Sequence, residues 1–155
     1  MISMRNILKS QILSMALLLM LCGGFSTVVV SAANRADTTF SFALNPKGGK
    51  KDYDHSSWRR KDNKSSVYMK VNSVKYSNNE ARAWVQGKKG SSSTKYYDCS
   101  GGHFIKVNRK GVYYLPNTVK QSGHGYARIG LQANSGSPNQ LNGVWSPDSG
   151  KTIAP

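Results

Sequence analysis

The chain has 155 residues, of which 22 are Lys or Arg and 7 are Asp or Glu, for a formal net charge of +15. This length allows one domain of ordinary size and leaves little room for a second. Its two cysteines exclude a scaffold held by several disulfides. The charge favours anionic partners over cationic ones, and it opposes self-association through like-charge repulsion.

An apolar segment with a short basic start opens the chain. Arg5 and Lys9 precede the apolar run at residues 15–21, and the small residues Ser31–Ala33 follow it. A basic start, an apolar middle and a small-residue end are typical of a secretory signal peptide, with cleavage here after Ala32 or Ala33. We therefore predict a signal peptide at residues 1–33. Residues 34–155 are predicted to be a single secreted domain, extracellular and able to associate with the cell wall.

The predicted mature part keeps 20 basic and 7 acidic residues, for a formal charge of about +13. Cys22 leaves with the signal peptide, so Cys99 has no partner for an intramolecular disulfide. We expect Cys99 to be buried as a small apolar residue, with a dimer bridge or a nucleophile as the alternatives. The protein is expected to be a monomer.

Short segments with alternating apolar residues follow the signal peptide and predict β-strands. The first covers residues 38–44. Residues 47–64 are polar and basic, and they are expected to form a long loop. Two more alternating segments cover residues 66–71 and 81–86. The inward residues predicted for these three strands are Phe40, Phe42, Leu44, Val67, Met69, Val71, Ala81, Ala83 and Val85.

The second half of the mature part continues the series of strands. Residues 87–93 are expected to form a flexible basic turn, and residues 96–99 and 104–107 are expected to form short strands. Residues 108–111 are typical of a hairpin turn leading into a strand at residues 112–115. Two last strands are predicted at residues 126–131, with Ala127, Ile129 and Leu131 inward, and at residues 141–145.

No segment of the predicted mature part has a sustained helical period. Seven or eight short strands separated by turns predict an all-β fold, an antiparallel sandwich or barrel.

Three segments of the mature part resemble a group of small exported proteins of Gram-positive bacteria that share a domain of unknown function. They are Asp37–Phe42, Asn117–Gly123 with Ala127 and Arg128, and Gly143–Ser149. Members of the group open with a similar Phe-Ser-Phe strand and close with a Gly-x-Trp-Ser-Pro-Asp segment. The resemblance implies an exported, mostly β protein, and it supplies no catalytic residues.

The closing segment also has a physical interpretation of its own. Trp145 can bury a large ring against a sheet, and Pro147 ends strand pairing. Asp148 can accept hydrogen bonds from nearby backbone N–H groups. We therefore interpret this segment as a structural clasp rather than a ligand site.

One local match suggests an enzyme. Asp98–Gly101 is identical to the nucleophile motif of secreted cell-wall peptidases of the NlpC/P60 type, and this resemblance implies Cys99 as the nucleophile and His124 as the base. That family places the cysteine at the start of a helix, whereas the residues after Cys99 predict a strand. The spacing before His124 is also too short for that fold. We therefore predict no catalysis and no cofactor. We also predict no metal site, because His55, His103 and His124 are scattered along the chain.

Basic residues interleaved with aromatic ones favour binding to an anionic polymer. Trp58 precedes one basic cluster, for which polymer binding and a solvated loop both stay open. Arg82 lies beside Trp84, which is expected on the outer face of its strand and which we interpret as a packing aromatic residue rather than a ligand contact. The predicted partner is an anionic cell-envelope polymer or a membrane surface, with no specific nucleic acid. A bacteriocin-like antimicrobial factor is the alternative. The residues predicted to bind through their charge are Arg59, Arg60, Lys61, Lys88 and Lys89.

Overall fold

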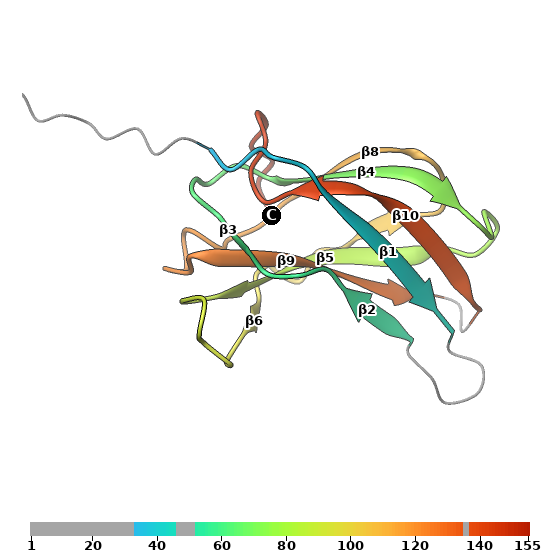
Figure 1. The fold of residues 1–155 in the computed structure, drawn as a ribbon, viewed down its shortest axis with the longest axis horizontal. Coiled ribbons are helices and arrows are strands. Elements are labelled where there is room, and N and C mark those ends of the chain that lie inside the picture. Colours follow the sequence, from blue (N-terminus) through green and yellow to red (C-terminus); the bar gives the residue numbers. More distant parts are fainter. Residues whose placement is uncertain (1–32, 46–51, 135–136) are drawn as a thin grey trace, which may run out of the picture. The chain divides into compact units, whose positions relative to one another are not determined.

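Figure 1 shows the computed structural model of the protein, which describes residues 33–45, 52–134 and 137–155. These residues all belong to one compact unit of the chain, Ser31–Pro155. They form ten β-strands and no helix. Within the described ranges no helix is long and apolar enough to cross a membrane. The predicted signal peptide up to Ala32 and residues 46–51 of the predicted loop lie outside the described residues.

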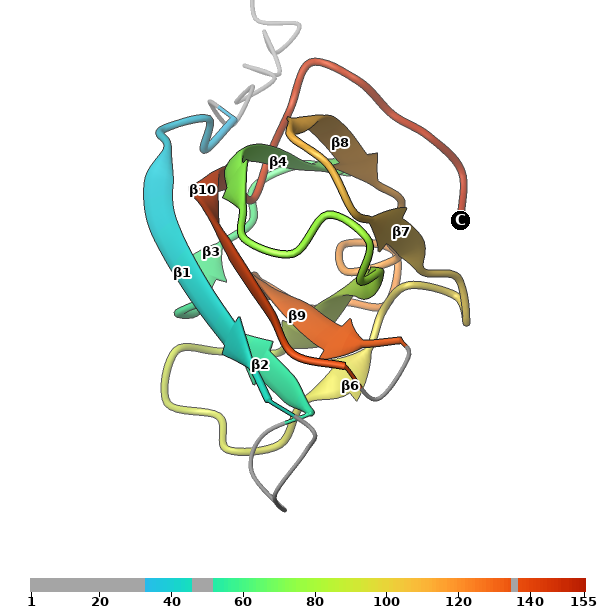
Figure 2. The ribbon, with the colours of Figure 1, turned by 90° about the vertical axis from the view of Figure 1, so that its right-hand side faces the viewer.

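The strands form two antiparallel sheets, which confirms the predicted all-β class and fits the sandwich rather than the barrel. The first sheet has the strand order β1-β10-β4-β8. Its strands are β1 (Thr38–Leu44), β10 (Asn139–Ser146), β4 (Val67–Val74) and β8 (Gly111–Leu115). In Figure 2, β4 and β8 lie above β9 and β6 of the second sheet.

The second sheet has the order β2-β9-β5-β6, and two short strands pair beside this path, β3 with β9 and β7 with β5. Its long central strands are β9 and β5, which pair over eight residues. The strands are β2 (Tyr53–His55), β3 (Arg59–Arg60), β5 (Ala81–Lys88), β6 (Tyr97–Asp98), β7 (Ile105–Val107) and β9 (Tyr126–Ala133).

The hydrophobic core lies between the sheets because successive residues of a strand point to opposite faces. The twelve inward residues predicted for β1, β4, β5 and β9 are all buried, with relative exposures of 7% or less. Strand β10 adds Leu141 and Trp145, both fully buried. Cys99 is buried as well, which confirms the expectation that it packs as a small apolar residue.

Three local predictions were wrong. The predicted loop at residues 47–64 contains β2 and β3, whose pairing with β9 is a tertiary contact that the local sequence does not specify. The predicted hairpin at residues 108–111 does not form, because β7 pairs with β5 and β8 pairs with β4 in the other sheet. Gly87 and Lys88, assigned to a flexible turn, complete strand β5.

A buried ion pair ties the segment after β3 to the segment after β10. The ammonium of Lys61 lies 3.1 Å from Asp148 Oδ1, and neither side chain has any exposed surface. The same ammonium donates to the carbonyl oxygens of Ser65 and Pro147, each at 2.6 Å. All three protons of the ammonium therefore have an acceptor, as a buried charge requires.

The carboxylate of Asp148 also joins three backbone segments. It accepts hydrogen bonds from the backbone N–H groups of Asn34 (2.8 Å), Asp62 (3.0 Å) and Asn63 (3.3 Å). The interpretation of the closing segment as a structural clasp is thus confirmed. We call the group formed by Asn34, Lys61, Asp62, Asn63 and Asp148 the Asp148 clasp.

Candidate functional site

Two of the five basic residues predicted to bind a polymer have their charge inside the protein. Lys61 belongs to the Asp148 clasp and is 1% exposed. Lys88 is 7% exposed, and its ammonium donates to the carbonyl oxygens of Ser91 and Ser93. The expectation that these two ammonium groups face a ligand is therefore corrected, because internal carbonyl oxygens already accept their protons.

The other three basic residues are placed differently from one another. Arg59 is half-buried, and its guanidinium donates to Ala36 O (2.6 Å) and to Asn34 Oδ1 (2.9 Å). Arg60 is exposed and pairs with Asp62 at 2.6 Å. Lys89 is exposed. Arg60 and Lys89 are thus the two exposed members of the predicted set, whereas Arg59 is half-buried and Lys61 and Lys88 are buried.

A different set of side chains gathers on the outer face of the second sheet. On this face Trp84 of β5 lies opposite Gly130 of β9. A Cβ atom at position 130 would stand 2.5 Å from two carbons of the Trp84 ring, so only glycine lets the indole lie against the sheet. The ring forms part of the wall of two adjoining cavities.

The two cavities share Trp84 and Gln132 and have volumes of about 250 and 210 Å³. We call them together the Trp84 groove. The larger cavity is also lined by Tyr53, Asp54, His55, Gln86, Tyr96 and Arg128. The smaller is also lined by Arg82, Asp98, Ser100, Gly102, His103 and Phe104.

Cations and aromatic rings are stacked along this groove. The guanidinium carbon of Arg128 lies 4.4 Å from the ring centre of Trp58 and 4.6 Å from that of Tyr96. Its Nε donates to Gln86 Oε1 at 2.7 Å. Burial lowers the pKa of Arg128, against the attraction of Tyr96. These contacts hold the guanidinium and its two rings in one arrangement.

A second stack borders the smaller cavity. The guanidinium of Arg82 lies 4.3 Å from the ring centre of Phe104, and its buried Nε has no hydrogen-bond partner among the described residues. Three large aromatic side chains of the groove are strongly exposed, Tyr53 at 54%, Tyr96 at 51% and Phe104 at 43%. The groove therefore combines exposed aromatic side chains with polar groups that can bind a ligand.

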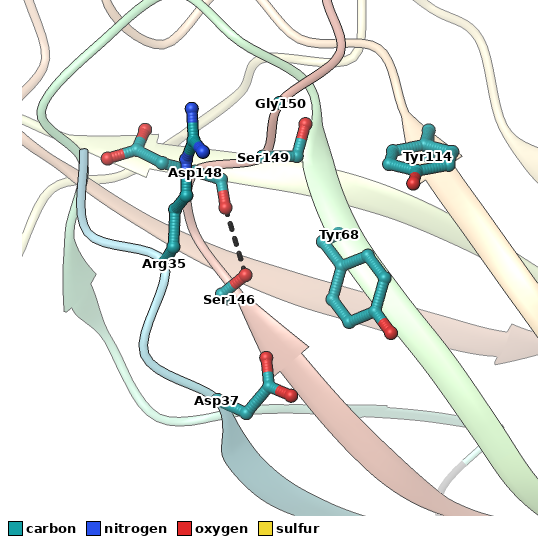
Figure 3. Close-up of a pocket in the computed structure, with 8 residues that line it drawn as sticks. All are labelled: Arg35, Asp37, Tyr68, Tyr114, Ser146, Asp148, Ser149 and Gly150. Carbon is teal, nitrogen blue, oxygen red and sulfur yellow. Dashed lines mark hydrogen bonds between the residues drawn. The ribbon is translucent and has the colours of Figure 1, made fainter.

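A third cavity, of about 210 Å³, lies at the Asp148 clasp (Figure 3). Tyr68 and Tyr114 face it from β4 and β8, with ring centres 5.9 Å apart. Burial and the Asp37 carboxylate raise the pKa of Tyr68. Ser146 donates to the backbone oxygen of Asp148, and the Asp148 carboxylate is occupied by the clasp, so these two polar groups of the cavity already have partners. It is a weaker candidate for a binding site than the Trp84 groove.

Cys99 and His124 meet beside Gly87. A Cβ atom at position 87 would stand 2.6 Å from Cys99 Sγ and 3.2 Å from His124 Cδ2. Burial, with a smaller contribution from the Asp98 carboxylate, raises the pKa of the Cys99 thiol. The imidazole of His124 stacks on the ring of Tyr97, with centres 5.1 Å apart. The buried thiol is thus favoured over the thiolate that a nucleophile needs, and the absence of catalysis stays a prediction.

The described residues also lack a cluster of side chains that could coordinate a metal ion. No three His, Cys, Asp or Glu side chains are grouped there in a way that would hold a metal ion.

Comparison with known proteins places the chain in a family. The model of a family described as "Protein of unknown function (DUF2712)" matches residues 28–149, which include all ten strands, the Trp84 groove and the Asp148 clasp. The chain belongs to this family. No curated protein and no solved structure matches it.

Sequence reasoning found only part of the groove in this DUF2712 chain. It placed Trp84 on the outer face of its strand and noted Arg82 beside it, but it interpreted Trp84 as a packing residue rather than a ligand contact. It missed Tyr96, Arg128 and Phe104, which come from loops and from another strand. The sequence did contain one indication of the groove, because Gly130 is a small residue at an outward-facing position of β9. That Gly130 lies opposite Trp84, however, is decided by how the strands pair in the fold.

Proposed function

We propose that the protein is exported and binds a glycopolymer of the cell envelope through the Trp84 groove, without catalysing a reaction. The observation that supports this most is the pair of adjoining cavities that share the Trp84 ring. Soluble proteins seldom expose several large aromatic side chains together unless that surface binds a partner. Here Tyr53, Tyr96 and Phe104 are such side chains.

The groove matches the chemistry of a sugar chain. A pyranose ring has C–H groups on a face, and these pack well against the electron-rich face of an aromatic ring. Its hydroxyl groups need donors and acceptors, which Gln86, Gln132 and Asp98 offer. Sites for drug-sized ligands have volumes of about 300–1,000 Å³. Both cavities of the Trp84 groove are below this range, so each has a size that suits one sugar unit.

The net charge contributes in another way. Inside the groove Arg82 and Arg128 are balanced by Asp54 and Asp98, so the groove is close to neutral. The excess of basic residues elsewhere attracts an anionic polymer over a longer range. Binding therefore has a part that salt weakens, carried by exposed residues such as Lys89, and a part that salt changes little, carried by the groove.

Retention of the purified exported protein on Gram-positive cell walls, with and without teichoic acid, tests the proposal across a salt series. Trp84→Ala is expected to lower retention at every salt concentration. The double variant Arg60→Ser with Lys89→Ser is expected to lower it at low salt only. Tyr76→Ala is the matched control, because Tyr76 is 42% exposed and lies outside the groove. Retention of Trp84→Ala equal to that of the wild type at high salt would contradict the assignment.

A further inference from the structure

Asn34 is held by its backbone and by its side chain. Its backbone N–H donates to Asp148 Oδ2 at 2.8 Å, and its backbone oxygen accepts from Asp148 N–H at 3.3 Å. Its side-chain amide donates to the Arg60 carbonyl at 2.8 Å and accepts from Arg59 at 2.9 Å. The residue directly after the second of the two expected cleavage sites is thus anchored in the Asp148 clasp.

The carboxylate of Asp148 has an asymmetric set of partners. Its Oδ1 faces the Lys61 ammonium at 3.1 Å, whereas the two donors on Oδ2 are the backbone N–H groups of Asn34 and Asp62. One carboxylate oxygen thus has a cation as its partner, and the other has only neutral donors in the uncleaved chain. A cation on Oδ2 would make a stronger, charge-assisted hydrogen bond than a neutral N–H group.

We propose that the signal peptide is removed after Ala33, so that the nitrogen of Asn34 becomes an α-ammonium paired with Asp148 Oδ2. The inference rests on the proposed export. A signal peptidase hydrolyses the Ala33–Asn34 peptide bond, one water is consumed, Ala33 keeps the new carboxylate, and Asn34 carries the new amine, which is protonated at neutral pH. Cleavage after Ala32 instead leaves a neutral amide N–H at Asn34.

The pairing makes stability depend on pH in a definite direction. An adjacent carboxylate favours the charged form of an amine, so it raises the pKa of the α-ammonium above its ordinary value of about 8. The stabilisation is fully present below that pH and is lost as the pH rises through the higher folded-state value. Asp148 is the charged group in contact with this nitrogen, and the other charged groups around it are Arg35, Arg59, Arg60, Lys61 and Asp62.

The test exports the full chain from a bacterial host with its own leader and determines the intact mass of the purified protein. The matched variant is Ala33→Leu, because leucine before the bond blocks cleavage there and moves it to the bond after Ala32. The wild type is expected to begin at Asn34. Its melting temperature is expected to exceed that of the variant by about 2–5 °C near pH 6, and this difference is expected to disappear as the α-ammonium loses its proton at higher pH.

The outcomes separate this inference from the proposal on which it rests. A wild-type protein that begins at another residue, or equal melting temperatures at every pH, overturns the pairing and leaves the Trp84 groove untouched. A secreted chain that keeps its leader overturns the inference and also removes the proposed processing. Loss of wall binding in the Trp84→Ala variant is measured separately and does not bear on the N-terminus.

Discussion

Replacing Asp148 by Asn tests how much the Asp148 clasp contributes to stability. The variant keeps the size of the side chain but removes its charge, so Lys61 stays buried without a counterion. The amide NH₂ of the variant also faces two donors, whichever way it is turned, because each carboxylate oxygen now accepts two hydrogen bonds. Breaking a buried ion pair in this way costs about 3–5 kcal/mol.

That cost is a large share of the stability of a domain, which is about 5–15 kcal/mol in total. We expect the melting temperature of Asp148→Asn to fall by about 10 °C or more. Urea denaturation followed by tryptophan fluorescence measures the change, because Trp145 is fully buried next to the clasp. Asp37→Asn is the control, since Asp37 is exposed and has no ion-pair partner among the described residues. Its free energy of unfolding is expected to change by less than about 0.5 kcal/mol.

The pH dependence of Asp148→Asn gives a second test of the same account. Burial, against the attraction of Asp148, lowers the pKa of Lys61 below the ordinary lysine value. The unfolded chain therefore keeps this proton to higher pH than the native chain, so the contribution of Lys61 to stability rises with pH. In Asp148→Asn the pKa of Lys61 falls further, because the attraction of the carboxylate is gone. The stability of the variant therefore rises more steeply with pH than that of the wild type. The stability gap between wild type and variant should shrink from about pH 7 to about pH 10. A gap below about 1 kcal/mol, or one independent of pH, would refute the reasoning.

Three further outcomes follow from close contacts. Gly143→Ala should destabilise the fold by about 1–3 kcal/mol or more in urea denaturation, because its methyl group would overlap the backbone oxygen of Lys70; wild-type stability would contradict this. Gly130→Ala should push the Trp84 ring off the sheet, because its methyl group would overlap the indole. The variant should stay folded, with a shifted tryptophan emission and weaker wall retention. An unchanged emission spectrum would contradict the contact between the Trp84 ring and Gly130. Cys99 should react with a thiol reagent only on unfolding, because burial raises its pKa and closes access to it; rapid labelling of the native protein would be inconsistent with that.

The core of the fold could be read from the sequence because strand pleating is local. Alternation at residues 67–71 and 127–131 assigns the inward face without knowledge of the partner strands. Pairing is not local in the same way. The turn-like residues 108–111 predict a hairpin, but the two flanking strands join different sheets, and only the packing of the whole domain decides that.

The partners of the charged residues could not be predicted from the local sequence either. Lys61 stands in a basic cluster, where surface exposure is the natural expectation, and its counterion Asp148 is 87 residues away. Arg128 was noted in a motif, but the two rings that enclose it come from residues 58 and 96. Local sequence therefore identified the residue types and could not identify which of them meet. The bacteriocin-like alternative stays a prediction, which growth inhibition by the purified protein would test.

The most direct test of the central claim is the affinity of the exported protein for a purified cell-wall glycopolymer, measured by calorimetry at high salt for the wild type, Trp84→Ala and the Tyr76→Ala control. Truncating a central aromatic side chain of a binding surface commonly costs more than about 1.4 kcal/mol, which is a tenfold change in affinity. The account predicts at least that loss for Trp84→Ala while the variant stays folded at the temperature of the measurement, and it predicts unchanged binding by Tyr76→Ala. Equal affinities for all three proteins would contradict it.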